Sequence, residues 1–199
     1  IDFPALGELV EWYIQNGVTG LFAVCQSSEM FFLSLEERVA ISRFVAEKAA
    51  GRVPVVASGH VSDDFEDQVR ELNAIAETGV DAVVLLTNRL AAEGEPDEVW
   101  IHNMDRLLER LDERYPLGLY ECPYPYKRVI SQKLAEYLVK TGRFSFLKDT
   151  SCDIDNIRMK LRVFQNSGLK LYNANTSTLR ESLQAGAAGY CGVMANFHP

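Results

Sequence analysis

The feature that most constrains the fold of this chain is a repeated alternation of short apolar runs and amphipathic segments. The apolar runs are continuous, which is typical of strands in a parallel sheet covered on both faces. We expect seven strands, at residues 20–25, 53–59, 82–87, 117–122, 145–150, 169–174 and 189–193. Helices are expected around them, at residues 3–16, 35–50, 63–78, 95–114, 129–141, 153–166 and 177–185.

A regular run of strand–helix units favours a (β/α)8 TIM barrel or a doubly wound sheet. The sequence opens on a helix that ought to follow another strand, and its last predicted strand has no helix after it. Full barrels typically have about 250 residues, whereas this chain has 199. We therefore expect a single partial TIM-barrel domain over residues 1–199 that lacks the first strand and the C-terminal helices.

Composition narrows the range of partners. The formal net charge of −8 argues against binding to nucleic acid or to an anionic membrane. The apolar runs are far shorter than the roughly 20 residues that span a bilayer. The four cysteines have no zinc-ligand spacing. They are expected to be reduced thiols in a cytoplasmic protein, with a redox-active or metal-binding cluster as the alternative.

The main chemical signal is an amine and a phenol near the ends of two successive strands. Lys148 lies in the expected strand 145–150, and Tyr120 lies at the equivalent point of the strand before it. A buried lysine is costly unless it is neutral or paired, and a buried tyrosine hydroxyl needs a partner. This pair suggests carbonyl chemistry through a Schiff base, with a proton shuttle beside it.

Each of these residues also has a structural interpretation. Lys148 could extend from the barrel rim into solvent, or could pair with Asp149 or Asp153. Tyr120 could be an aromatic that fills the barrel interior. A barrel enzyme of another chemistry, built on His60 and Glu29, is a further alternative. The two centres are distinguished by whether Lys148 and Tyr120 approach each other.

Other polar residues follow the ends of the expected strands, where barrel enzymes carry their chemistry. Ser27 and Ser28, next to Gln26, can offer hydroxyls and amides to an anionic group such as a substrate carboxylate. Asn173 lies where a substrate hydroxyl could be recognised, although it could equally be a turn residue. No nucleotide-binding glycine motif is present.

Four motifs in order give the chain a resemblance to a known family. It resembles the dihydrodipicolinate synthase / N-acetylneuraminate lyase family of Schiff-base-forming TIM-barrel lyases. The family's Gly-Thr-Thr-Gly-Glu, Tyr-Asn-x-Pro, Lys-(Asp/Glu)-(Ser/Ala/Thr)-Ser-Gly-Asp and Gly-Ala-x-Gly…Ala-Asn-x-x-Pro patterns are matched by residues 25–29, 120–123, 148–153 and 186–199.

The resemblance implies a role for each matched residue. Lys148 would form the imine with a 2-oxo acid such as pyruvate, and Tyr120 would be the acid and base. Ser27 would hold the substrate carboxylate, within the loop that also contains Gln26 and Ser28. Cys191 falls where the family has an aliphatic residue whose backbone lies by the imine. Neither a metal nor an organic cofactor is implied, and family members are often homotetramers built from tight dimers.

The sequence also departs from the family pattern. Gln26 replaces the threonine that links two tyrosines in the synthase's proton relay, and Pro125 aligns with the arginine that binds the aldehyde substrate's carboxylate. Lys127 or Arg128 could replace that arginine. The expected function is a class I lyase or aldolase that makes or breaks a carbon–carbon bond on a 2-oxo acid. The alternatives are a sugar-acid dehydratase of the same family and a non-catalytic 2-oxo acid binding protein.

Overall fold

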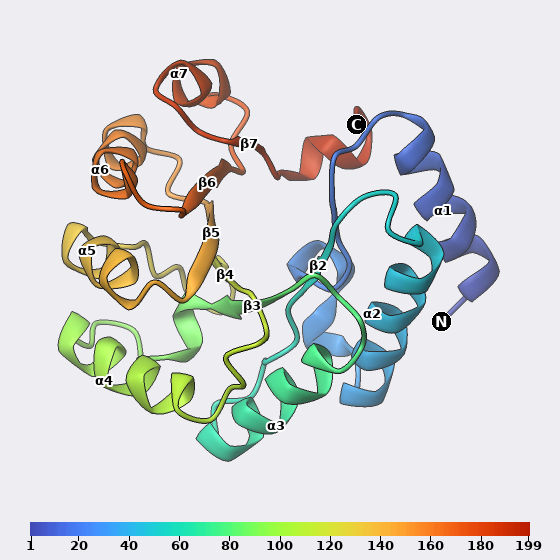
Figure 1. Ribbon diagram of the computed structural model, residues 1–199, viewed down its shortest axis with the longest axis horizontal. Coiled ribbons are helices and arrows are strands. Elements are labelled where there is room, and N and C mark those ends of the chain that lie inside the picture. Colours follow the sequence, from blue (N-terminus) through green and yellow to red (C-terminus); the bar gives the residue numbers. More distant parts are fainter. The chain divides into compact units, whose positions relative to one another are not determined.

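The computed structural model describes every residue from 1 to 199. It contains all seven expected strands and all seven expected helices, in the expected order. Each strand pairing described below is parallel, so the chain has a parallel α/β fold (Figure 1). The chain divides into two compact units, residues 1–85 with 196–199 and residues 86–195. The expectation of one partial barrel domain stays a prediction.

The first unit contains three helices and three strands, which alternate along the chain. Strand β1 pairs with β2, and β2 pairs with β3. Two short 3₁₀ turns, Gln26–Ser28 and Met30–Phe32, follow β1. The elements are α1 (Phe3–Gln15), β1 (Leu21–Phe22), α2 (Leu35–Ala49), β2 (Val55–Ala57), α3 (Phe65–Ala76) and β3 (Ala82–Leu86).

The second unit is a four-stranded parallel sheet in the order β4-β5-β6-β7. Figure 1 shows helices α4, α5 and α6 following one another along one side of these strands. The elements are α4 (Asp97–Leu108), β4 (Leu117–Tyr120), α5 (Gln132–Thr141), β5 (Phe144–Asp149), α6 (Ile154–Phe164), β6 (Lys170–Asn173), α7 (Leu179–Gln184) and β7 (Gly189–Tyr190).

Side-chain caps fix where several helices begin. Ser34 and Glu37 form a reciprocal capping box at the start of α2. Ser131 accepts a hydrogen bond from the Leu134 amide at the start of α5, and Asp153 caps α6 through the amides of Asp155 and Asn156. Each cap satisfies amides that the helix itself leaves unpaired.

Several elements are shorter than the sequence predicts. The helix expected over 95–114 ends at Leu108, and Asp112 then accepts hydrogen bonds from the amide and guanidinium of Arg114 in a turn. The strand expected over 117–122 ends at Tyr120, because the Cys122 amide turns back to the Tyr120 carbonyl. The last strand stops at Tyr190, and a 3₁₀ turn covers Val193–Asn196. The residues expected at these strand ends therefore lie on turns.

The register of the second unit determines which side chains share a face. Tyr120 pairs with Lys148, and Lys148 pairs with Tyr172. One residue earlier, the buried Leu119, Leu147 and Leu171 form the neighbouring row. Successive residues of a strand point to opposite faces, so Tyr120, Lys148 and Tyr172 lie on the face opposite the leucines.

A glycine makes room for an aromatic ring on the same face as Lys148. A Cβ atom at Gly118 would lie 2.3 Å from the Phe146 ring, so the ring lies directly over this glycine. The Phe146 ring also meets the Tyr172 ring edge-to-face, with centroids 6.0 Å apart.

No helix of the chain is long and apolar enough to cross a membrane.

Candidate active site at the ends of strands β4 and β5

Lys148 and Tyr120 lie side by side at the carboxyl ends of β5 and β4. The Lys148 Nζ atom lies over the Tyr120 ring, 4.4 Å from its centroid. This is within the range of a cation–π contact. The two residues are nearly buried, with exposed fractions of 8% and 5%. The strands thus bring a sheltered primary amine against a phenol.

The immediate surroundings of this pair are aromatic and include a residue that the sequence reasoning missed. Tyr172 pairs in register with Lys148 from β6. Its position could have been found by matching the expected strand ends, since 172 has the same place in its strand as Lys148. Cys191 follows β7 two residues after Gly189, which pairs with Tyr172. The Cys191 amide donates to the Asn173 carbonyl at 2.9 Å, and a position of its backbone by the imine stays a prediction.

The acidic residues near Lys148 in sequence have other partners. The Asp149 carboxylate lies 2.6 Å from the Nζ atom of Lys160, on helix α6. Asp153 caps the start of the same helix. Lys148 is 8% exposed, so it does not extend from the rim into solvent. These positions do not support the structural interpretations of Lys148.

A charged cluster behind the Tyr120–Lys148 pair was not anticipated from the sequence. Lys160 contacts Glu121 and Asp149, and all three side chains are fully buried. Burial raises the pKa of the Glu121 carboxyl above its usual range; the neighbouring Lys160 ammonium opposes this rise, and Asp149 adds to it. The available signal was an acidic residue directly after each of Tyr120 and Lys148.

Asn173 does not join the amine and the phenol. Its side-chain amide donates hydrogen bonds to Thr178 and Ser182, both at 3.0 Å, and its carbonyl oxygen accepts one from the Asn175 amide. The residue is fully buried toward helix α7. These hydrogen bonds hold the turn between β6 and α7, and a role for Asn173 in substrate binding stays a prediction.

The predicted carboxylate-binding loop belongs to the first unit and forms a 3₁₀ turn, Gln26–Ser28. The Cys25 thiol lies 3.0 Å from the Ser27 hydroxyl, and the Ser28 hydroxyl donates to the Ala23 carbonyl at 3.3 Å. The Ser27 side chain is exposed. The loop thus offers hydroxyls on a short turn, and their binding role stays a prediction.

Two basic residues are candidates to bind the carboxylate of a second substrate, and they differ in the partners that they already have. Arg128 forms an ion pair with Asp97 at 2.9 Å and donates to the Glu95 carbonyl. Lys127 is exposed, and its ammonium donates to the Thr150 carbonyl at 2.7 Å, two residues after Lys148. Lys127 is therefore the better placed of the two.

The alternative centre built on His60 and Glu29 has less support. His60 is fully buried, and its Nδ1 atom lies 3.4 Å from Gln68. Glu29 is exposed, in a left-handed backbone conformation at φ 56°. The loop after β2 is held by Glu71, whose carboxylate accepts hydrogen bonds from the Val61 and Ser62 amides. These are structural contacts.

No group of three or more histidine, cysteine or acidic side chains is arranged to hold a metal ion.

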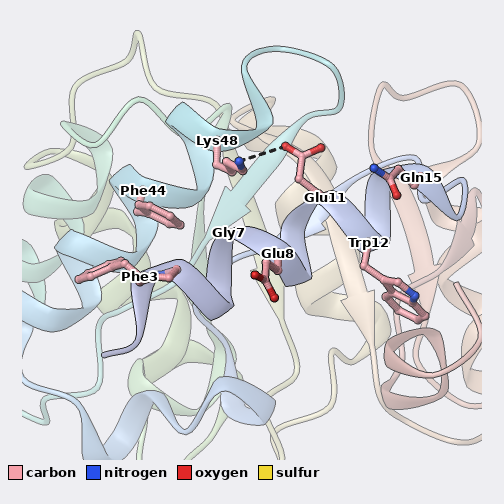
Figure 2. A pocket seen from close by; sticks show the side chains of 9 residues that line it. Phe3, Gly7, Glu8, Glu11, Trp12, Gln15, Phe44 and Lys48 are labelled. Atoms are coloured by element: carbon pink, nitrogen blue, oxygen red, sulfur yellow. Dashed lines mark ion pairs between the residues drawn. The ribbon is translucent and has the colours of Figure 1, made fainter.

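A groove of about 620 Å³ runs along helices α1 and α2 of the first unit (Figure 2). The rings of Phe3, Phe44 and Trp12 are among the side chains that line it, as are Glu11 and Lys48, which form an ion pair.

Comparison with known proteins finds relatives that share one name. The 4-hydroxy-tetrahydrodipicolinate synthases of Bacillus velezensis and Thioalkalivibrio sulfidiphilus are 27% and 28% identical to this chain, over 201 and 204 residues. The alignments cover 98% and 100% of this chain but 66% of each relative. The chain thus spans just under two thirds of the length of these proteins.

Solved structures agree on the fold. A pyruvate complex of a prophage protein of the dihydrodipicolinic acid synthase family, from E. coli K12, superposes with a TM-score of 0.87 at 21% identity, covering all of this chain and 66% of that one. A chloride-inhibited dihydrodipicolinate synthase from Acinetobacter baumannii, complexed with pyruvate, gives 0.86 at 24% identity, covering 98% and 65%.

The strand order, the Tyr120–Lys148 pair and the four motifs lead to one family, and its model matches residues 1–199. The chain belongs to the dihydrodipicolinate synthetase family.

Proposed function

We propose that this chain carries the reaction centre of a class I lyase or aldolase that forms a Schiff base between Lys148 and a 2-oxo acid of the pyruvate type. The single observation that carries this proposal is the Lys148 amine, nearly buried and 4.4 Å from the centroid of the Tyr120 ring. Family membership and the pyruvate complexes of similar structures support it. The same relatives support a TIM barrel of which this chain is a part.

In the proposed reaction the unshared pair of the Lys148 nitrogen forms a bond to the keto carbon of the substrate. The nitrogen gives up a proton and the keto oxygen takes one up, which gives a carbinolamine. Its hydroxyl takes up a second proton and leaves as water, which gives an iminium ion. The iminium then accepts the electron pair released when a proton or a carbon–carbon bond leaves the adjacent carbon. The aromatic face of Tyr120 next to the nitrogen suits the positive charge of this intermediate.

Tyr120 is proposed to move the protons. Its hydroxyl would donate a proton to the departing hydroxyl group, and its phenolate would take a proton back when the adjacent carbon, or the hydroxyl of the cleaved carbon–carbon bond, loses one to give the enamine. We propose that Gln26, Ser27 and Ser28 bind the substrate carboxylate and that the backbone near Cys191 lies by the imine, on the strength of the motif matches. Lys127 is our candidate for the carboxylate of a second substrate. The protein is also proposed to work as a homo-oligomer.

Trapping the imine tests the proposal. The protein is incubated with pyruvate and then reduced with borohydride, and peptide mass spectrometry locates the adduct. We expect one reduced adduct, on Lys148. Lys140, an exposed lysine on helix α5, is the matched control: Lys140→Ala removes the same charge and should leave trapping unchanged.

Two variants distinguish catalysis from binding alone. Lys148→Ala should abolish both trapping and turnover. If the protein were a non-catalytic sensor, the Lys148→Ala variant would still bind the 2-oxo acid about as well as the unmodified protein does. Tyr120→Phe keeps the ring and removes the hydroxyl, so turnover should fall by about 10²- to 10⁴-fold, the usual worth of a positioned acid or base. An unmodified Lys148 after trapping across a panel of 2-oxo acids and 2-oxo sugar acids would refute the proposal.

A further inference from the structure

Three charged side chains of the second unit are completely removed from solvent and contact one another. We call Glu121, Asp149 and Lys160 the buried triad; each has an exposed fraction of 0%. Helix α6 supplies Lys160, whose Nζ atom contacts Glu121 Oε1 and lies 2.6 Å from Asp149 Oδ2. A buried ammonium shared by two carboxylates is rare without a structural or functional reason, because each charge loses its hydration.

The carboxylate oxygens of the triad are also bound to the backbone. Glu121 accepts hydrogen bonds from the amides of Ile130 and Thr150, both at 2.8 Å. Asp149 accepts from the amide and the hydroxyl of Ser151 at 2.9 and 2.7 Å. The triad therefore fixes the backbone after β5 and the entry to helix α5, in addition to neutralising charge.

The position of the triad in sequence links it to the proposed reaction centre. Glu121 directly follows Tyr120, and Asp149 directly follows Lys148. Neighbouring strand residues point to opposite faces, so Asp149 lies on the face of β5 opposite Lys148. Lys160 of helix α6 contacts Asp149 there and also contacts Glu121, just after the end of β4. The Thr150 hydroxyl donates to the Glu121 carbonyl at 2.5 Å, which ties the same two strand ends together.

We propose that Lys160 is a positioning residue for Schiff-base formation: by holding Glu121 and Asp149 at one point behind the sheet, it keeps the Lys148 amine over the Tyr120 ring. This inference rests on the proposed function, and it concerns residues outside the amine–phenol pair. Misplacement of a reacting group by about 1 Å can cost roughly 100-fold in rate. Such a loss is therefore the expected scale of the effect.

The main test replaces Lys160 with methionine, which has a similar length and no charge. The maximum rate of pyruvate-dependent borohydride trapping at Lys148 should fall by about 100-fold, while the pyruvate concentration at half-maximal rate changes little. A purely structural role would lower the amount of trapped protein without lowering the rate constant of the folded fraction. Arg158→Met is the matched control, because Arg158 is an exposed, ion-paired cation on the same helix.

A second readout does not depend on imine chemistry. Acetylation of Lys148 by acetic anhydride, measured relative to Lys140 by peptide mass spectrometry, reports how well the amine is sheltered. Lys160→Met should speed the acetylation of Lys148 and leave that of Lys140 unchanged. Asp149→Asn provides a milder variant if Lys160→Met does not fold, because an asparagine oxygen can still accept both Ser151 hydrogen bonds.

The outcomes separate the two proposals. A folded Lys160→Met or Asp149→Asn protein whose trapping rate and Lys148 acetylation equal those of the unmodified protein overturns the positioning role. If the unmodified protein forms no adduct with any 2-oxo acid, the proposed function is wrong. In that case Lys148 acetylation alone decides whether Lys160 positions the amine: faster acetylation in the variant supports the role, and an unchanged rate overturns it.

Discussion

Removal of the buried cation should also cost stability, by an amount that follows from its surroundings. Lys160→Met leaves the carboxylates of Glu121 and Asp149 buried, at 0% exposure, without their shared ammonium. Breaking a buried ion pair by removing one partner typically costs about 3–5 kcal/mol. That is about two to four orders of magnitude in the ratio of folded to unfolded protein, and a large part of a typical domain stability of about 5–15 kcal/mol.

The loss of stability in Lys160→Met should depend on pH, and Glu121 determines the direction of that dependence. Burial already raises the pKa of this carboxyl, and the Lys160 ammonium is the main factor that opposes the rise. A carboxyl whose pKa is raised in the folded state favours folding when it is protonated, and this contribution is lost as the pH rises through the folded-state value. The stability deficit of Lys160→Met should therefore be largest where Glu121 is charged and should shrink as the pH is lowered and Glu121 takes up a proton.

Urea unfolding followed by tryptophan fluorescence can measure the deficit. Trp100 is fully buried in the same unit and donates a hydrogen bond to the Thr87 carbonyl at 2.8 Å, so its emission reports on this unit. Arg158→Met should lose less than about 1 kcal/mol, since exposed ion pairs contribute little. A Lys160→Met protein with the stability of the control at alkaline pH, and an unchanged dependence on urea, would refute the reasoning.

Two further predictions concern packing and surface charge. Gly118→Ala should destabilise the protein by about 1–3 kcal/mol in urea unfolding, because the added methyl group would lie 2.3 Å from the Phe146 ring. Adding Phe146→Leu to this variant should recover part of the lost stability. A Gly118→Ala protein of equal or higher stability would contradict the prediction. The hydrogen bond from Arg52 lowers the pKa of Glu11 from 4.5 to about 2, so the charged carboxylate favours the folded state. The stability advantage over Glu11→Gln should be complete above pH 4.5 and should disappear as the pH falls toward 2; a difference that persists to the lowest pH would contradict this assignment.

The number, order and type of the secondary-structure elements could be predicted from the sequence. Continuous apolar runs separated by amphipathic segments predict parallel strand–helix units because hydrophobic periodicity is a local property. The positions of Lys148 and Tyr120 at strand ends were predictable for the same reason. The ends of the elements were less predictable. Helix α4 ends at Leu108, and in the turn that follows Arg114 donates hydrogen bonds to Asp112, which periodicity does not encode.

Only the tertiary structure decided which polar residues meet. Lys160 is twelve residues from Lys148 along the chain and on a different element, yet it is fully buried against Glu121 and Asp149. Asn173 lies one residue after Tyr172 in the same strand, and its side chain hydrogen-bonds to the helix side of the sheet. The sequence by itself determined the βα architecture and the residues proposed to carry the chemistry, because these depend on local pattern and residue type. The register of neighbouring strands and the docking of α6 decided which face each side chain occupies, because those contacts join residues that are distant along the chain.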